Sequence, residues 1–247
     1  RGSLVSNGDF RINQAWSWGW RAVLTTDRSF LDDYDQPGTE GEALQTGVNT
    51  LFLTGLGERN YADVRGYGFR VLQEDFRGGD VLDPPNPFTP VGQDLQDKQP
   101  IVHPVIDYDG VLDSSLAGGE LAWQLNLTSL TRRETDAFGV IRNGMRTAGF
   151  RGVEGTFSRA SARLAWRRQL IGPLGQVLTP YAGAQGDVFL IDDRDRAVTA
   201  LENGVVGRGM PWIGMQYRWP WVAAAGWGTQ TMEPIAQITV RPDETAI

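Results

Sequence analysis

The sequence predicts an all-β protein, an antiparallel up-and-down transmembrane β-barrel segment. Between residues 16 and 241, about ten stretches alternate polar and apolar side chains with a period of two, as strands with one polar and one apolar face do. The connections between these stretches are alternately long and short. This sorting is typical of a barrel in a membrane, because odd-numbered connections emerge on one side of the bilayer and even-numbered ones on the other.

Long connections are expected over residues 27–45, 76–99, 131–155 and 191–208, and tight ones over 55–60, 109–118, 171–176 and 220–228. The first long connection is rich in Asp and Glu, which is typical of a solvated loop. The second contains the fragment DPPNPFTP, whose prolines cannot sustain a ladder of backbone hydrogen bonds. Both segments are therefore predicted to be loops.

The first predicted strand covers residues 16–26, where Trp16, Trp18 and Trp20 share one face. Strands over 45–54 and 61–73 flank the fragment GLGERN and predict a hairpin. The next strand is expected to begin near residue 103. The clearest alternation follows over residues 118–130: Leu121, Trp123, Leu125 and Leu127 share one face, and Glu120, Gln124, Asn126 and Thr128 share the other.

Strands over 156–170 and 177–191 flank the turn IGPLGQ. The last pair alternates in the same manner, with Ile213, Met215, Tyr217 and Trp219 on one face before the turn and Met232, Ala236, Ile238 and Val240 after it. Several of these strands exceed the 9 to 11 residues that cross a bilayer. Walls that continue beyond the membrane surface would explain the excess.

Composition excludes several classes of protein. A net charge of -7 and a pI near 4.8 argue against a nucleic-acid partner, which requires clustered positive charge. No apolar run approaches the roughly 20 residues of a membrane-spanning helix. The chain has no Cys and 1 His, so thiol chemistry and the usual zinc sites are excluded. It begins at Arg1 without an initiator Met or a signal peptide, and we expect a fragment of a longer protein.

Several strings of the sequence closely resemble the barrel of the LptD family of lipopolysaccharide-assembly proteins, in its alphaproteobacterial form. The strings are PIVHPVIDYD (100–109), GGELAWQLNLTSLTR (118–132), SRASARLAWRR (158–168), GQVLTPYAGAQGDVF (175–189), MPWIGMQYRWP (210–220) and WGTQTMEPIAQITVRPDET (227–245). They occur in the family's order and extend the likeness over most of the chain from about residue 46.

The resemblance implies a location in the cell outer membrane and a role in lipopolysaccharide export. Residues 1–247 would then be part of one β-barrel domain, about ten strands of a larger barrel, without the periplasmic jelly-roll domain. It implies as partners lipopolysaccharide, membrane lipids, a lipoprotein plug (LptE-like) and a periplasmic bridge protein (LptA-like). Neither an enzymatic activity nor a cofactor is expected. Lateral-gate residues and disulfides cannot be transferred, because the matching segments and cysteines are absent.

A polar wall facing the lumen is the candidate site. It comprises Glu120, Gln124, Asn126, Arg159, Arg163, Arg167, Gln185, Asp187, Gln216, Arg218, Glu233 and Gln237. Within it, Arg159, Arg163 and Arg167 form a ladder on one face of a strand. The ladder either binds phosphates or acidic sugars of lipopolysaccharide, or is neutralised by Glu120, Asp187 and Glu233 on neighbouring strands. Neutralisation is the favoured interpretation.

Other candidates also have two interpretations. Five tryptophans either anchor the wall at the lipid interface, which is the favoured interpretation, or stack on sugars. They are Trp123, Trp166, Trp212, Trp219 and Trp227. His103 is expected to be a wall residue rather than a metal ligand. Asp193 and Asp195 are expected in a solvated loop, because the calcium-loop pattern fails at Ala197. A stand-alone pore or protease barrel, or a soluble sugar-binding β-sandwich, are the alternatives for the whole chain.

Overall fold

The computed structural model describes residues 1–28, 30, 46–72, 95–142, 145–195, 202–243 and 245–246. Most of the predicted acidic loop and the DPPNPFTP fragment lie outside the described residues. Among the residues that the structure describes, no helix is long and apolar enough to cross a membrane.

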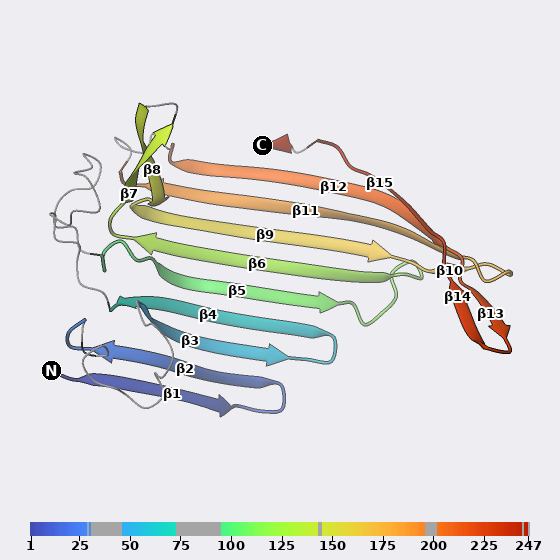
Figure 1. Ribbon diagram of the computed structural model, residues 1–247, viewed down its shortest axis with the longest axis horizontal. Helices are drawn as coiled ribbons and strands as arrows, with labels where there is room; N and C mark the ends of the chain where they lie inside the picture. Colours follow the sequence, from blue (N-terminus) through green and yellow to red (C-terminus); the bar gives the residue numbers. More distant parts are fainter. Residues whose placement is uncertain are drawn as a thin grey trace.

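Ten strands lie side by side in one antiparallel sheet (Figure 1). In order across the sheet they are β1 (Ser3–Arg11), β2 (Trp16–Thr25), β3 (Thr46–Leu56), β4 (Asn60–Val71), β5 (Ile101–Val111), β6 (Glu120–Arg132), β9 (Gly155–Arg167), β11 (Val177–Asp193), β12 (Gly204–Arg218) and β15 (Ile235–Val240). Two short strands, β10 (Leu170–Ile171) and β16 (Thr245–Ala246), pair with β11 and β12. The predicted all-β, up-and-down antiparallel fold is confirmed.

The connections are sorted between the two ends of the sheet as predicted (Figure 1). The chain leaves β2, β4, β6 and β11 at one end, where the longer connections begin. Short connections join β1 to β2, β3 to β4 and β5 to β6 at the other end. These two ends are called the long-loop end and the short-loop end below.

Three elements differ from the prediction. The first strand, β1, was missed because its centre reads Asn7-Gly8-Asp9, a sequence typical of a tight hairpin turn. The connection predicted over 131–155 contains a hairpin of its own, β7 (Asp136–Arg142) with β8 (Met145–Gly152). The turn predicted over 220–228 is a second hairpin, β13 (Trp221–Ala225) with β14 (Gly228–Met232), which projects from the short-loop end (Figure 1).

The two faces of the sheet differ in chemistry. The pairing register places the apolar side chains of each strand opposite the apolar side chains of its neighbours. In the centre of the sheet, the residues opposite one another in successive strands are Trp123, Leu164, Ala184 and Pro211. This surface, called the apolar face below, carries many large exposed side chains. They include Leu4, Leu24, Leu51, Leu125, Leu127, Leu164, Val188, Leu190, Ile213, Met215, Ile238 and Val240.

No second layer covers the apolar face within the described residues, because the extensive contacts between strands are all between strands that pair in a sheet. Among those residues, the buried apolar side chains are Val23, Val71 and Leu72. A soluble β-sandwich needs two apolar sheet faces that pack against each other in a hydrophobic core. The described part of the sheet has no such core. The sheet is also open, because β1 and β15 end the strand order without pairing with each other in the described part of the chain.

Glycines opposite aromatic rings recur across the sheet. On the apolar face the pairs are Gly8 with Trp20, Gly55 with Trp16, and Gly110 with Trp123. On the other face they are Gly19 with Phe52, Gly183 with Trp212, and Gly214 with Tyr181. In each pair a Cβ on the glycine would collide with the ring. The missing side chain therefore lets the ring lie flat against the neighbouring strand.

Candidate functional site

The second surface of the sheet, called the polar face below, holds the predicted polar wall. Its residues lie in cross-strand rows set by the register: Glu120 with Arg167; Gln124 with Arg163 and Gln185; Asn126 with Ser161 and Asp187; Thr128 with Arg159; and Gln216 with Gln237. Arg218 belongs to the same face, and Glu233 joins it from the connection before β15. The predicted set is therefore brought together on one surface.

Arg167 at the end of β9 is paired with a carboxylate. Its Nε and Nη2 donate hydrogen bonds of 3.0 Å and 2.8 Å to Oε1 of Glu120 on β6. Both side chains are exposed to solvent, so the pair contributes little to stability and chiefly fixes the orientation of the guanidinium.

Asp187 is the most buried charge of the predicted wall, with a relative exposure of 4%. It accepts hydrogen bonds from the Ser161 hydroxyl and, at 2.7 Å, from Nε of Arg208 on β12. Its cation is thus Arg208 and not a member of the ladder. Sequence reasoning missed Arg208 because it lay at the end of a predicted loop, although it has the same parity as Gln216 and Arg218.

The remaining two ladder residues have no carboxylate partner within 4.0 Å among the described residues. Arg159 donates a hydrogen bond of 3.2 Å to the amide oxygen of Asn126. Arg163 lies over the indole of Trp212, with its Cζ 5.1 Å from the ring centroid. Glu233 pairs with Arg218 at 3.5 Å instead. Neutralisation of the ladder by neighbouring carboxylates is therefore correct for Arg167 and wrong for Arg159 and Arg163.

An acidic group on β4 and β5 extends the polar face and was not predicted. Asp63, with an exposure of 6%, accepts hydrogen bonds of 2.6 Å from Arg65 and 2.7 Å from Thr54. Asp107 is opposite Asp63 and accepts a hydrogen bond of 2.6 Å from Asn126. The alternation of Asp63 with Arg65, and of Asp107 with Asp109, was the signal that could have identified this group.

The tryptophans occupy different surfaces. Trp123 and Trp166 lie on the apolar face, and the Trp166 indole donates a hydrogen bond of 2.8 Å to the Leu116 carbonyl at the short-loop end. Trp212 lies on the polar face. Trp219 donates to the Leu174 carbonyl at 3.1 Å, also at the short-loop end. Trp227 is exposed in the turn of the β13–β14 hairpin. Interface anchoring stays a prediction for each of them.

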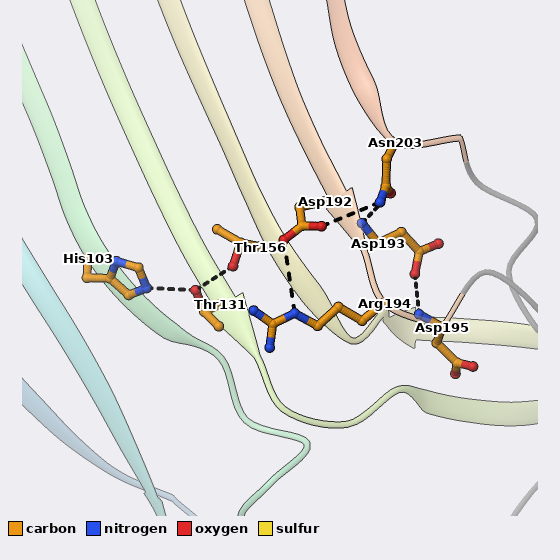
Figure 2. A network of polar contacts seen from close by, with 8 residues as sticks. All are labelled: His103, Thr131, Thr156, Asp192, Asp193, Arg194, Asp195 and Asn203. Atoms are coloured by element: carbon orange, nitrogen blue, oxygen red, sulfur yellow. Dashed lines mark hydrogen bonds and ion pairs between the residues drawn. The ribbon is translucent and has the colours of Figure 1, made fainter.

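Polar side chains line the long-loop end of the sheet (Figure 2). His103 on β5 contacts the Thr131 hydroxyl at 2.8 Å, and Thr131 contacts Thr156 on β9 at 3.0 Å. Next to this pair, the hydroxyls of Ser129 and Ser158 are 2.8 Å apart. These residues form a hydroxyl row that ends the apolar face on the side of the long connections.

At the same end, Asp192 and Asp193 are the last two residues of β11. Asp193 is buried, with a relative exposure of 2%, so the prediction of a solvated loop is wrong for this residue. Asp193 accepts a hydrogen bond of 2.8 Å from the Asp195 backbone N–H, and its own N–H donates to the Asn203 amide oxygen at 2.6 Å (Figure 2). Arg194 approaches Asp192 at 4.0 Å. In the part of the chain that the structure describes, no group of three or more His, Cys, Asp or Glu could hold a metal ion.

Comparison with known proteins identifies the family. No curated protein matches the chain. A family model, described as LPS transport system D (LptD), matches residues 1–246, which is nearly the whole chain. Proteins of this family act in the transport and assembly of lipopolysaccharide in the outer membrane. The chain belongs to the LptD family.

Proposed function

We propose that this chain is part of the wall of a cell outer-membrane barrel that moves lipopolysaccharide to the outer leaflet. The apolar face contacts acyl chains, and the polar face lines a water-filled interior. The observation that carries the proposal is the uncovered apolar face in a member of a lipopolysaccharide-transport family. A contiguous surface of this kind marks an interaction site, and a bilayer fits one that extends across successive strands.

Two further points support a barrel that is larger than the described sheet. The open edges at β1 and β15 carry backbone groups that hydrocarbon cannot satisfy, so a barrel in lipid has to pair them with further strands. Residues 1–247 are accordingly proposed to be part of one outer-membrane β-barrel domain. An LptE-like lipoprotein is proposed to fill the interior, and an LptA-like bridge protein to deliver lipopolysaccharide through a periplasmic domain.

The proposed role is that of a passive conduit. The chain is proposed to catalyse no reaction and to need no cofactor, and the energy for export comes from other components of the transport system. The polar face contributes a path along which sugars and phosphates stay solvated or hydrogen-bonded, while the acyl chains of the cargo are kept apart from them.

Two experiments test this function. The first is depletion of the protein in cells while newly made lipopolysaccharide at the cell surface is labelled with a membrane-impermeant reagent. Loss of surface labelling, with lipopolysaccharide retained inside the envelope, is expected. Undiminished labelling after full depletion contradicts the proposal.

The second experiment tests the assignment of the faces. The chain has no Cys, so single-cysteine variants at neighbouring positions of β9 report one face each. Leu164→Cys is expected to react with a lipid-soluble maleimide, and Arg163→Cys with a charged, water-soluble one. The reverse pattern contradicts the assignment.

A further inference from the structure

We propose that Arg163, held against Trp212, is a contact for the phosphorylated or acidic sugars of lipopolysaccharide on the polar face. This inference rests on the proposed function and adds to it the residue pair and the chemical group that it binds.

The local backbone holds the indole in position. Trp212 on β12 is opposite Gly183 on β11, and a Cβ at Gly183 would collide with the Trp212 ring and with the Leu164 carbonyl. The indole therefore lies across β11 and reaches Arg163 on β9. The Arg163 guanidinium lies over the ring, 5.1 Å from its centroid.

This contact leaves the guanidinium N–H groups available for an anion. The Cζ of Arg163 lies over the ring, and a guanidinium can bind phosphate or carboxylate through two parallel hydrogen bonds in its own plane. Arg65, Arg167, Arg208 and Arg218 each have a carboxylate within 4.0 Å. Arg163 has none among the described residues, so it offers a positioned cation that no acidic side chain neutralises.

A hollow beside Arg163 gives a ligand room. Small side chains lie opposite one another in successive strands: Val111, Ala122 and Ala165, followed by Gly183. The hollow has a volume of about 630 Å³ and is lined in part by Arg163, Ala165, Gln124, Tyr61 and Asp109.

The lining matches a phosphorylated sugar better than a bare anion. Gln124, Tyr61 and Asp109 supply acceptors and donors of the kind that hold sugar hydroxyls. Asp109 would repel a phosphate placed on its own side of the hollow, so the anionic group of the ligand is directed to Arg163. Glu58 and Arg59 also line the hollow, but Arg59 lies within 4.0 Å of Asp113 and Glu120. Arg163 is therefore the lining cation that has no carboxylate partner among the described residues.

The contact is expected to contribute little to the stability of the fold. Arg163 is exposed, and a cation–π contact at an exposed site contributes little to stability. Substitutions at position 163 can therefore be tested in the assembled, full-length protein in its own membrane.

The experiment uses a photocrosslinking residue in place of Gln124, which is opposite Arg163 in the register, and measures crosslinks to lipopolysaccharide in cells. Arg163→Gln is expected to lower the crosslink yield roughly tenfold or more, the effect of losing a charge-assisted hydrogen bond. Arg163→Lys keeps the charge but loses the paired donors and is expected to give an intermediate yield. Trp212→Leu is expected to lower it as well, because the guanidinium loses its support.

Arg21→Gln is the matched control, since it removes one positive charge from the same face on the distant strand β2. It is expected to leave the yield unchanged. Unchanged crosslinking in Arg163→Gln, or an equal loss in Arg21→Gln, overturns the inference, because the effect would then be absent or due to net charge. The inference is also overturned if the photocrosslinking residue captures lipopolysaccharide when it replaces Gln216 or Gln237 but not when it replaces Gln124. Absence of crosslinks at every polar-face position contradicts the proposed function itself.

Discussion

A charge on the apolar face gives the sharpest test of how the sheet lies in a membrane. Leu164 is the chosen position, because it is opposite Ala184, the midpoint of the apolar run from Leu178 to Leu190 in β11. Each half of that run covers six residue-to-residue steps (178 to 184 and 184 to 190). At ~3.3 Å per residue and a tilt of ~40°, each half is about 15 Å along the membrane normal.

Leu164→Arg is therefore expected to place a charge near the middle of the bilayer, too deep for the side chain to reach water easily. The expected loss of stability is about 2–4 kcal/mol, the effect of an arginine at the midplane on the lipid side of a barrel. This corresponds to a roughly 30- to 900-fold lower ratio of folded to unfolded protein. Leu164 is half exposed, so little packing is lost with it.

The assay is a urea titration of the protein folded in lipid vesicles, with protease resistance as the second readout. Gln185→Arg is the matched control, because it adds the same side chain on the opposite face beside Arg163. Repulsion between two exposed arginines costs about 1 kcal/mol or less in water. Leu164→Met controls for shape. Equal losses at positions 164 and 185, or a larger loss at 185, would refute the assignment of the two faces.

Three further predictions concern single elements of the sheet. Gly183→Ala is expected to destabilise the protein by about 1–3 kcal/mol in the same urea titration, since the new methyl group displaces the Trp212 ring. Gly186→Ala is the control and is expected to be neutral, because the nearest atom to its new Cβ would be 3.9 Å away. Asp187→Asn is expected to cost about 1–2 kcal/mol, because the buried acceptor of Ser161 and Arg208 loses its charge while half-exposed Arg208 stays solvated; an unchanged urea midpoint would contradict this. Replacing residues 219–234 by an Asn-Gly turn is expected to leave the amount of assembled protein unchanged, because β13 and β14 pair only with each other; failure to assemble would show that the hairpin is needed for folding.

The strands and their faces could be predicted from sequence because alternation is a local property. Leu121 to Thr128 alternate without a break, and the register places them as expected. The prediction failed where alternation is weak. The β13–β14 hairpin is exposed on both sides, so its sequence VAAA does not distinguish two faces. In β1, the Asn7-Gly8 pair resembles a turn although the strand continues through it.

The partners of the charged residues could not be predicted, because they depend on register across strands that are distant in sequence. The period-two alternation placed Arg163 and Asp187 on the same face. It could not predict whether the two side chains lie close enough to pair. The partner of Asp187, Arg208, lies four residues inside β12, which begins at Gly204 within the predicted loop over 191–208. The contact between Arg163 and Trp212 depends in addition on Gly183 of β11, because a side chain at this position would collide with the indole.

The glycine–aromatic pairs imply a pattern of linked inheritance among related chains. A lineage that replaces Trp16 or Trp123 by a small residue removes the atoms nearest to the glycine opposite, and alanine or serine can then enter at Gly55 or Gly110. The reverse order of changes is blocked, because the methyl group would arrive while the ring still fills the site. Homologues should therefore keep or lose both members of a pair together, and the surviving pairs would mark the register of the ancestral sheet.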